Sequence, residues 1–146
     1  MRFFVVSDIH SFYKPLVDAL DTAGFDANNP DHWLVVCGDC FDRGPDSGLV
    51  LQFLMKLEKK ILIKGNHDVW LNELEWKDYF VKVCDYLKIK DQERSVVLMH
   101  YPIEEWDGFF RDTYHLYGHV HNNENDLKEI EGRYNVGVDV NDFEPK

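Results

Sequence analysis

The 146-residue chain lacks any apolar stretch that approaches the length needed to cross a bilayer, which is about 20 residues. Its amino terminus meets a carboxylate at Asp8, too early for a signal peptide. Cysteine is scarce too, with Cys37, Cys40 and Cys84 as an odd set in which one Cys-x-x-Cys pair has no second pair to complete a zinc site. We therefore expect a cytoplasmic protein with reduced thiols and no membrane partner.

Positive charge is also in short supply, with 16 Lys and Arg against 27 Asp and Glu and a formal net charge of −11. A surface of that sign repels phosphate backbones, so we expect no binding of long nucleic acid by bulk charge. Hydrophobic residues make up 45% of the chain and aromatic residues 14%, which argues against disorder. We expect one folded domain over residues 1–146.

Short apolar runs recur along the chain and predict strands at residues 3–6, 33–37, 61–63, 96–99, 116–117 and 134–138. Apolar residues at helical spacing predict helices at about 12–23, 47–57 and 69–87. Strands that alternate with helices indicate an α/β fold whose first half is mainly parallel, followed by a strand-rich second half.

Asp, Asn or His follows five of the predicted strands at the carboxyl end. In an open α/β sheet such ends line one edge, where these folds bind ligands. Five of the seven histidines fall there: His10, His67, His100, His119 and His121. Buried beside Asp8, Asp39 and Asn66 without a cation, these histidines would leave charges and lone pairs unsatisfied.

A mixed set of imidazoles and carboxylates suits Mn, Fe, Zn or Ni better than Ca or Mg, which prefer oxygen ligands. One cation cannot use this many ligands. We therefore expect two divalent transition-metal ions as cofactors, with manganese as the first choice and Fe, Zn or Ni as the others. A single zinc ion is the alternative, and it would leave Asn66 and several histidines without a role.

Five motifs resemble the five blocks of the calcineurin-like metallophosphoesterases, in the order of that family. They are Asp8-Ile9-His10, Gly38-Asp39-(x)2-Asp42-Arg43-Gly44, Gly65-Asn66-His67-Asp68, His100 and Gly118-His119-Val120-His121. The resemblance implies a compact β-sandwich flanked by helices. The short stretch between the third and fourth motifs leaves no room for a cap domain. One position departs from the family, because Ser11 stands where a glycine usually follows Asp-x-His.

The resemblance also implies what each residue does. The first metal would be held by Asp8, His10 and His121, the second by Asn66, His100 and His119, and Asp39 would bridge them. A hydroxide that bridges the metals would attack a phosphate mono- or diester in line, and His67 would protonate the leaving oxygen. In addition, Asp42 would orient His67, and Arg43 would hold phosphate oxygens. A simple Asp-Arg-Gly-Pro turn is the alternative for Asp42 and Arg43.

Two features of the motifs bear on the substrate. The Asp42-Arg43-Gly44 extension resembles the protein serine/threonine phosphatases and dinucleoside tetraphosphatases, whereas residues 100–102 and 134–140 resemble small bacterial and phage phosphoesterases. We therefore expect a small phosphate ester or a phosphoprotein as substrate. The alternative function is a catalytically silent, metal-binding interaction scaffold, which would be expected to have lost ligands or the acid histidine. The sequence retains all of them.

Overall fold

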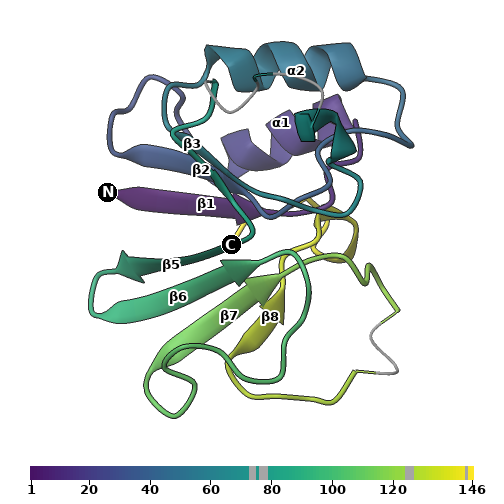
Figure 1. The fold of residues 1–146 in the computed structure, drawn as a ribbon. Helices are drawn as coiled ribbons and strands as arrows, with labels where there is room; N and C mark the ends of the chain where they lie inside the picture. The colour runs from purple at the N-terminus through teal and green to yellow at the C-terminus, as the bar shows by residue number, and fades with distance from the viewer. Residues whose placement is uncertain (73–74, 76–78, 124–126, 144) are drawn as a thin grey trace.

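The computed structural model describes residues 1–72, 75, 79–123, 127–143 and 145–146 and shows three layers (Figure 1). Two helices lie over one face of a four-stranded sheet, and a second four-stranded sheet packs against the other face. The strand order is β1-β2-β3-β4 in the first sheet and β5-β6-β7-β8 in the second. The architecture is thus the α/β sandwich that the sequence predicts, with both helices on the same side.

The first sheet is parallel throughout. Its strands are β1 (Arg2–Val6), β2 (His32–Val36), β3 (Lys60–Ile63) and β4 (Lys82–Cys84). Helices α1 (Tyr13–Thr22) and α2 (Ser47–Lys56) connect the first three strands, close to the predicted ranges. Because all three strands run the same way, their carboxyl ends meet at one edge of the sheet.

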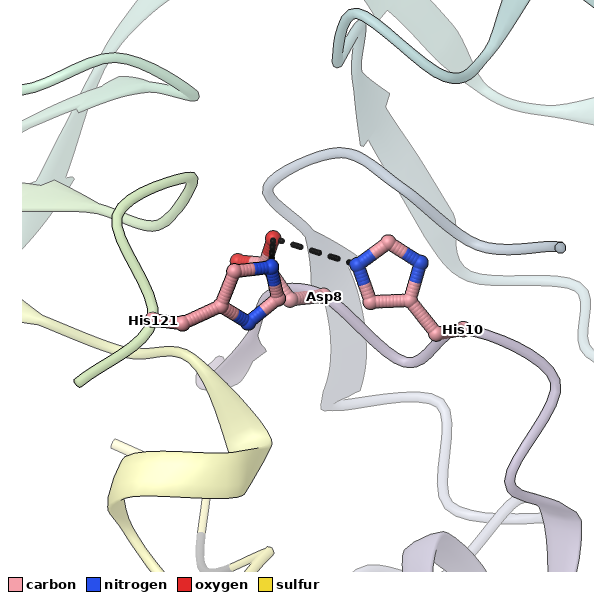
Figure 2. A group of neighbouring side chains, drawn as sticks. All are labelled: Asp8, His10 and His121. Atoms are coloured by element: carbon pink, nitrogen blue, oxygen red, sulfur yellow. Dashed lines mark ion pairs between the residues drawn. The ribbon is translucent and has the colours of Figure 1, made fainter. Parts of the chain in front are cut away.

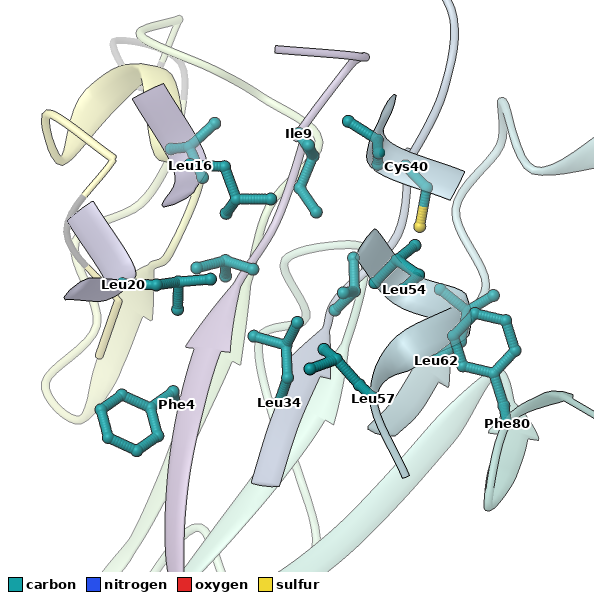
Figure 3. Packing of buried hydrophobic residues seen from close by; sticks show 14 of the residues in the cluster. Phe4, Ile9, Leu16, Leu20, Leu34, Cys40, Leu54, Leu57, Leu62 and Phe80 are labelled. Carbon is teal, nitrogen blue, oxygen red and sulfur yellow. The ribbon is translucent and has the colours of Figure 1, made fainter. Parts of the chain in front are cut away.

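Two apolar cores explain why these strands are apolar without alternation. Phe4 and Val6 pack with Leu16 and Leu20 of α1 in the core between sheet and helices (Figure 3). Val5, between them in the sequence, points the other way into the core between the two sheets. Successive side chains of a strand face opposite sides, so a strand covered on both faces needs apolar residues at every position.

The second sheet is mixed. Strands β5 (Tyr86–Asp91) and β6 (Arg94–Met99) form an antiparallel hairpin, and β7 (Thr113–Tyr117) and β8 (Arg133–Asn135) run parallel to β6. After β8 the chain crosses to the first sheet, where Ser7 N–H donates to the Val136 carbonyl at 2.9 Å and Val138 N–H donates to the Ser7 carbonyl at 2.9 Å. This crossing joins the ends of the two sheets.

The prediction of a third helix over residues 69–87 is wrong. Val69–Asn72 forms a short 3-10 helix (η1), and β4 and β5 take up residues from Lys82 onward; residues 73–74 and 76–78 of the predicted range lie outside the described part. Phe80 packs in the first core from the bend before β4, and Val83 packs against that core from β4 itself. The same apolar pattern is compatible with a helix or with a strand. β-branched and aromatic residues favour a strand, and the free edge of β3 was available to pair with one.

The last predicted strand, 134–138, is also shorter than expected. β8 ends at Asn135, and the 3-10 helix η4 (Val138–Val140) follows directly after the crossing to Ser7.

The three cysteines are free thiols, and burial raises the pKa of Cys37 and Cys40. Among the described residues, no helix has the length and apolar character to span a membrane.

Candidate metal centre

The structure brings every site residue that the sequence predicts to one place, where the strands of both sheets end. The loops after β1, β2 and β3 carry seven of them, and the segments after β6 and β7 carry the other three. His119 backbone N–H donates to Asp8 Oδ2 at 3.0 Å, so the two sheets meet within the site itself. Three parallel strands and two from the other sheet therefore point their ends at a common centre.

These loops have an unusual backbone. Among the described non-glycine residues with positive φ are eight in or beside the predicted motifs: Asp8, His10, Ser11, Asp39, Asp42, Arg43, His119 and His121. Such conformations are strained for residues with a side chain, and they persist where the surrounding structure enforces them, as at functional sites. At Ser11, where the family has glycine, φ is 65°, and its hydroxyl lies 2.7 Å from that of Ser47.

Glycines allow the loops to come this close together. Gly38 has φ of 96°, and a Cβ there would collide with His100 Nδ1 and with the backbone of Gly65. A Cβ on Gly118 would collide with Ser7 Oγ and with Asp8 Oδ2. Both positions require glycine because a neighbouring site residue occupies the space of a side chain.

The first group of ligands consists of Asp8, His10 and His121 (Figure 2). His10 Nε2 lies 3.6 Å and His121 Nε2 lies 3.8 Å from Asp8 Oδ1, and the three ligand atoms lie within 4.8 Å of one another. Asp8 Oδ1 and His10 Nε2 are buried and have no hydrogen-bond partner among the residues that the structure describes. Buried polar atoms are normally paired, so two such atoms that face each other fit a cation between them.

Carboxylates hold both imidazoles of this group from behind. His10 Nδ1 lies 2.5 Å from Asp42 Oδ1, and His121 Nδ1 lies 2.7 Å from Asp139 Oδ2. A hydrogen on each Nδ1 leaves the Nε2 lone pair free to face Asp8, which is the usual arrangement behind metal-binding histidines. In the structure, Arg43 Nη1 donates to Nε2 of His121 at 3.1 Å.

The second group centres on His100. Its Nδ1 donates to the Cys37 carbonyl at 2.7 Å, and its Nε2 lies 3.4 Å from Asp39 Oδ2 and 3.1 Å from Asn66 Oδ1. His119 Nδ1 lies 3.0 Å from the same Asn66 oxygen. Four atoms that can offer lone pairs thus lie close together, where cations or protons have to separate them.

Asp39 lies between the two groups. Its Oδ2 is 3.4 Å from His100 Nε2 and 3.9 Å from His10 Nε2, while its Oδ1 accepts the backbone N–H of His67 at 3.0 Å. Asp8 also reaches both groups, since it lies within 4.8 Å of the ligand atoms of Asp39 and His100. The residues therefore fit two neighbouring cations that share a carboxylate.

The electrostatics of the site agree with this arrangement. Burial opposes ionisation of Asp8 and Asp39, but the nearby imidazoles, above all His10 and His100 respectively, act together with neighbouring donors to lower the pKa of both carboxyls. Burial also opposes protonation of His10 and His100, yet the neighbouring carboxylates raise the pKa of both imidazoles. Each of these carboxylates is thus paired with an imidazole. In the absence of a metal ion, that imidazole binds a proton instead.

The remaining predicted residues lie at the rim of the centre. Asp42 bridges two histidines, because its Oδ2 lies 2.7 Å from His67 Nδ1 while its Oδ1 holds His10. The side chain of His67 is 36% exposed, so a substrate can reach it. With Nδ1 bonded to Asp42, Nε2 is the nitrogen of His67 that is left for a substrate. A simple Asp-Arg-Gly-Pro turn would not require Asp42 to contact both His10 and His67.

Two carboxylates to which the motifs assign no role also support the site. Asp139 holds His121, and buried Asp68 accepts the backbone N–H groups of Asp39 at 2.8 Å, Cys40 at 3.1 Å and Gly65 at 2.9 Å. Burial raises the pKa of Asp68 although these donors oppose the shift. The signal for Asp68 was its place directly after Asn66-His67, and the signal for Asp139 was its place in the 134–140 segment.

Comparison with known proteins places these features in one family. The family model described as calcineurin-like phosphoesterase matches residues 1–140. A symmetrical bis(5'-nucleosyl)-tetraphosphatase of Proteus mirabilis is 40% identical over 130 residues, which cover 73% of this chain and 47% of that protein, and the one of Buchnera aphidicola subsp. Schizaphis graminum is 31% identical with the same coverage. The chain spans about half the length of these relatives.

Solved structures share the fold at lower sequence identity. A protein of unknown function from Aquifex aeolicus has a TM-score of 0.65 and 22% identity, with 98% of this chain and 93% of that chain covered. The phosphoesterase Yfce from E. coli has a TM-score of 0.59 and 17% identity, with 94% and 78% covered. Because the family model matches nearly the whole of this chain, the chain belongs to the calcineurin-like phosphoesterase family.

Proposed function

We propose that the chain is a metal-dependent phosphoesterase that hydrolyses small phosphate mono- or diesters at the centre described above. The observation that carries the proposal is the pair of unpartnered buried atoms, Asp8 Oδ1 and His10 Nε2, beside a second convergence of lone pairs at His100. The first cation would be held by Asp8, His10 and His121, the second by Asn66, His100 and His119, with Asp39 shared between them.

Two divalent transition-metal ions, manganese as the first choice, would supply Lewis acidity and hydroxide near neutral pH when bound. The chain's own part begins with charge. Most of the ligands are neutral imidazoles and an amide, so Asp8 and Asp39 cancel only part of the cationic charge, and the centre attracts phosphate despite the acidic surface. Arg43, next to His121, would hold a non-bridging phosphate oxygen with its guanidinium.

His67 is the group that would move a proton. As the P–O bond to the leaving group breaks, the departing oxygen takes a proton from His67 Nε2, and the hydrogen bond to Asp42 keeps the ring in the orientation for that transfer. None of the site motifs pairs a serine or cysteine nucleophile with a base, and Cys37 and Cys40 are buried with a raised pKa. The chemistry therefore needs no covalent intermediate with the protein.

The test compares p-nitrophenyl phosphate, bis-p-nitrophenyl phosphate and a dinucleoside tetraphosphate, each with Mn²⁺ added or chelated. The third substrate is taken from the names of the relatives. Asp39→Asn is the blank, and Asp18→Asn on the exposed face of α1 is the matched control. We expect turnover that requires metal, is absent in the blank and is retained in the control.

Absence of turnover on every substrate, with two metals bound per chain, would overturn this proposal and favour the interaction scaffold. If turnover occurs, the ratio of the monoester rate to the diester rate assigns the preferred class. A metal content of one per chain in the active protein would instead contradict the binuclear assignment.

A further inference from the structure

A pocket of about 390 Å³ opens beside the first ligand group. One side of it is polar and includes Asp8, His10 and His121, together with Arg43. Its volume falls in the range of small-molecule sites, and it adjoins the place where the phosphate would be held. A substrate bound at the metal centre therefore has a cavity available for its organic part.

The other side of the pocket is apolar and partly aromatic. Phe12, Pro15, Val138 and Phe143 line it, and the rings of Phe12 and Phe143 meet edge to face with centroids 6.4 Å apart. Phe12 is 42% exposed even though it is a large apolar residue next to the charged centre. Exposed aromatic surface beside a polar site is typical of a ligand-binding wall.

The backbone holds both rings in place. Phe12 immediately precedes α1, and its backbone N–H donates to the Ile9 carbonyl at 3.0 Å. Phe143 has a φ of 64° and donates its N–H to the Val138 carbonyl at 2.7 Å. The apolar wall is thus built from the loop that carries His10 and from the segment that follows Asp139, so it is linked to the ligands of the first group.

Charge limits what can enter this pocket. Asp8 and Asp139 both line it, so a second anionic group would be repelled, and Arg43 offers its cation near the phosphate end. Alkyl groups would bury apolar area against these walls, but they cannot form the stacked or edge-to-face contacts that an aromatic group makes with the two phenyl rings. The walls therefore favour a neutral, planar, aromatic group that is attached to a phosphate.

We propose that this pocket, through Phe12 and Phe143, binds the base of a nucleotide substrate. The inference rests on the proposed function, because it takes the phosphate to be held at the metal centre. It assigns substrate preference to two residues outside the five motifs. Other aromatic residues have different partners: Trp106 is buried and donates to the Thr113 carbonyl, Phe109 and Phe110 pack on one another, and Tyr13 packs on Phe53.

The kinetic test uses a matched pair of substrates, AMP and ribose 5-phosphate, which share the reacting ester bond and differ in the base. We expect the wild-type protein to prefer AMP in kcat/KM. Phe12→Ala and Phe143→Ala should each lower the AMP to ribose 5-phosphate ratio by about tenfold, a typical loss for one stacking contact with a base. Phe110→Ala, at a residue that is 88% exposed and outside the pocket, should keep the wild-type ratio.

Two further variants guard against a loss of folding. Phe143 also packs against the first core, so Phe143→Leu and Phe12→Leu keep apolar volume but remove the aromatic plane. We expect these variants to unfold at nearly the wild-type temperature and still lose most of the preference for AMP. A ratio unchanged in all four pocket variants would overturn the inference.

A binding measurement separates this inference from the proposed function. His67→Asn protein loaded with diamagnetic Zn²⁺ is mixed with AMP, and saturation is transferred by NMR from the aromatic side chains to the ligand. We expect strong transfer to the adenine protons, and loss of it in the Phe12→Ala background. Transfer without any turnover by the wild-type protein would support the pocket while the proposed function fails, and absence of transfer would overturn the pocket.

Discussion

The two ligand groups of the centre differ in what stands behind their histidines. In the first group, carboxylates of Asp42 and Asp139 hold His10 and His121. In the second, the partners are a backbone carbonyl behind His100 and an amide oxygen beside His119. A carboxylate makes an imidazole a stronger ligand than a neutral carbonyl does. The comparison indicates a first site that binds its metal more tightly and a second site that exchanges more readily.

The largest effect should come from the residue that belongs to both groups. Asp39→Asn removes the charge that lies 3.4 Å from His100 Nε2 and 3.9 Å from His10 Nε2. We expect hydrolysis to fall more than about 10³-fold, and metal content to drop from two ions per chain to one or fewer. Elemental analysis of the purified protein beside the activity assay measures both. Two retained metals would contradict the shared position of Asp39.

Removing the proton donor should leave both groups intact. For His67→Asn we expect metal content to stay at two per chain and turnover to fall about 10²- to 10⁴-fold. The loss should be greatest for an alkyl phosphate, whose leaving oxygen needs the proton, and smaller for p-nitrophenyl phosphate. Full activity on the alkyl ester would show that His67 is not the general acid.

The asymmetry between the groups is tested by Asp139→Asn, which weakens only the first. We expect metal affinity at that site to fall about 10- to 100-fold, with the second site unchanged, as seen in a two-site calorimetric titration. Asp142→Asn, three residues along the same segment, is the matched control. Equal weakening of both sites would show that the carboxylate behind His121 does not distinguish the groups.

The effect shared by both groups is the response to pH. Since neighbouring carboxylates raise the pKa of His10 and His100, protons compete with metal at these imidazoles in the metal-free protein. Metal affinity should therefore rise with pH until both imidazoles are deprotonated, by about tenfold per pH unit for each proton displaced. Calorimetry in buffers of different ionisation enthalpy counts the protons released. Affinity that falls as pH rises from 6 to 8 would contradict the pKa directions.

Much of the site follows from local sequence. Apolar runs followed by Asp, Asn or His mark strand ends, and parallel strands bring such ends to one edge, so eight of the ten predicted residues could be named before any geometry was known, and the family resemblance added Asp42 and Arg43. The segment 69–87 shows the limit of this reasoning. Its apolar residues satisfy helical spacing, but the free edge of β3 was available for pairing, and local spacing contains no information about that edge.

The sequence by itself determined the α/β alternation, the order of the motifs and the set of residues with lone pairs to offer a metal. Only the tertiary structure decided which of them share a centre and which supporting groups serve them. Asp42 holds two histidines, Asp139 holds a third, and Phe12 meets Phe143 across almost the whole length of the chain. Such contacts depend on how the two sheets pack, because residues far apart in sequence come together only when both cores are buried.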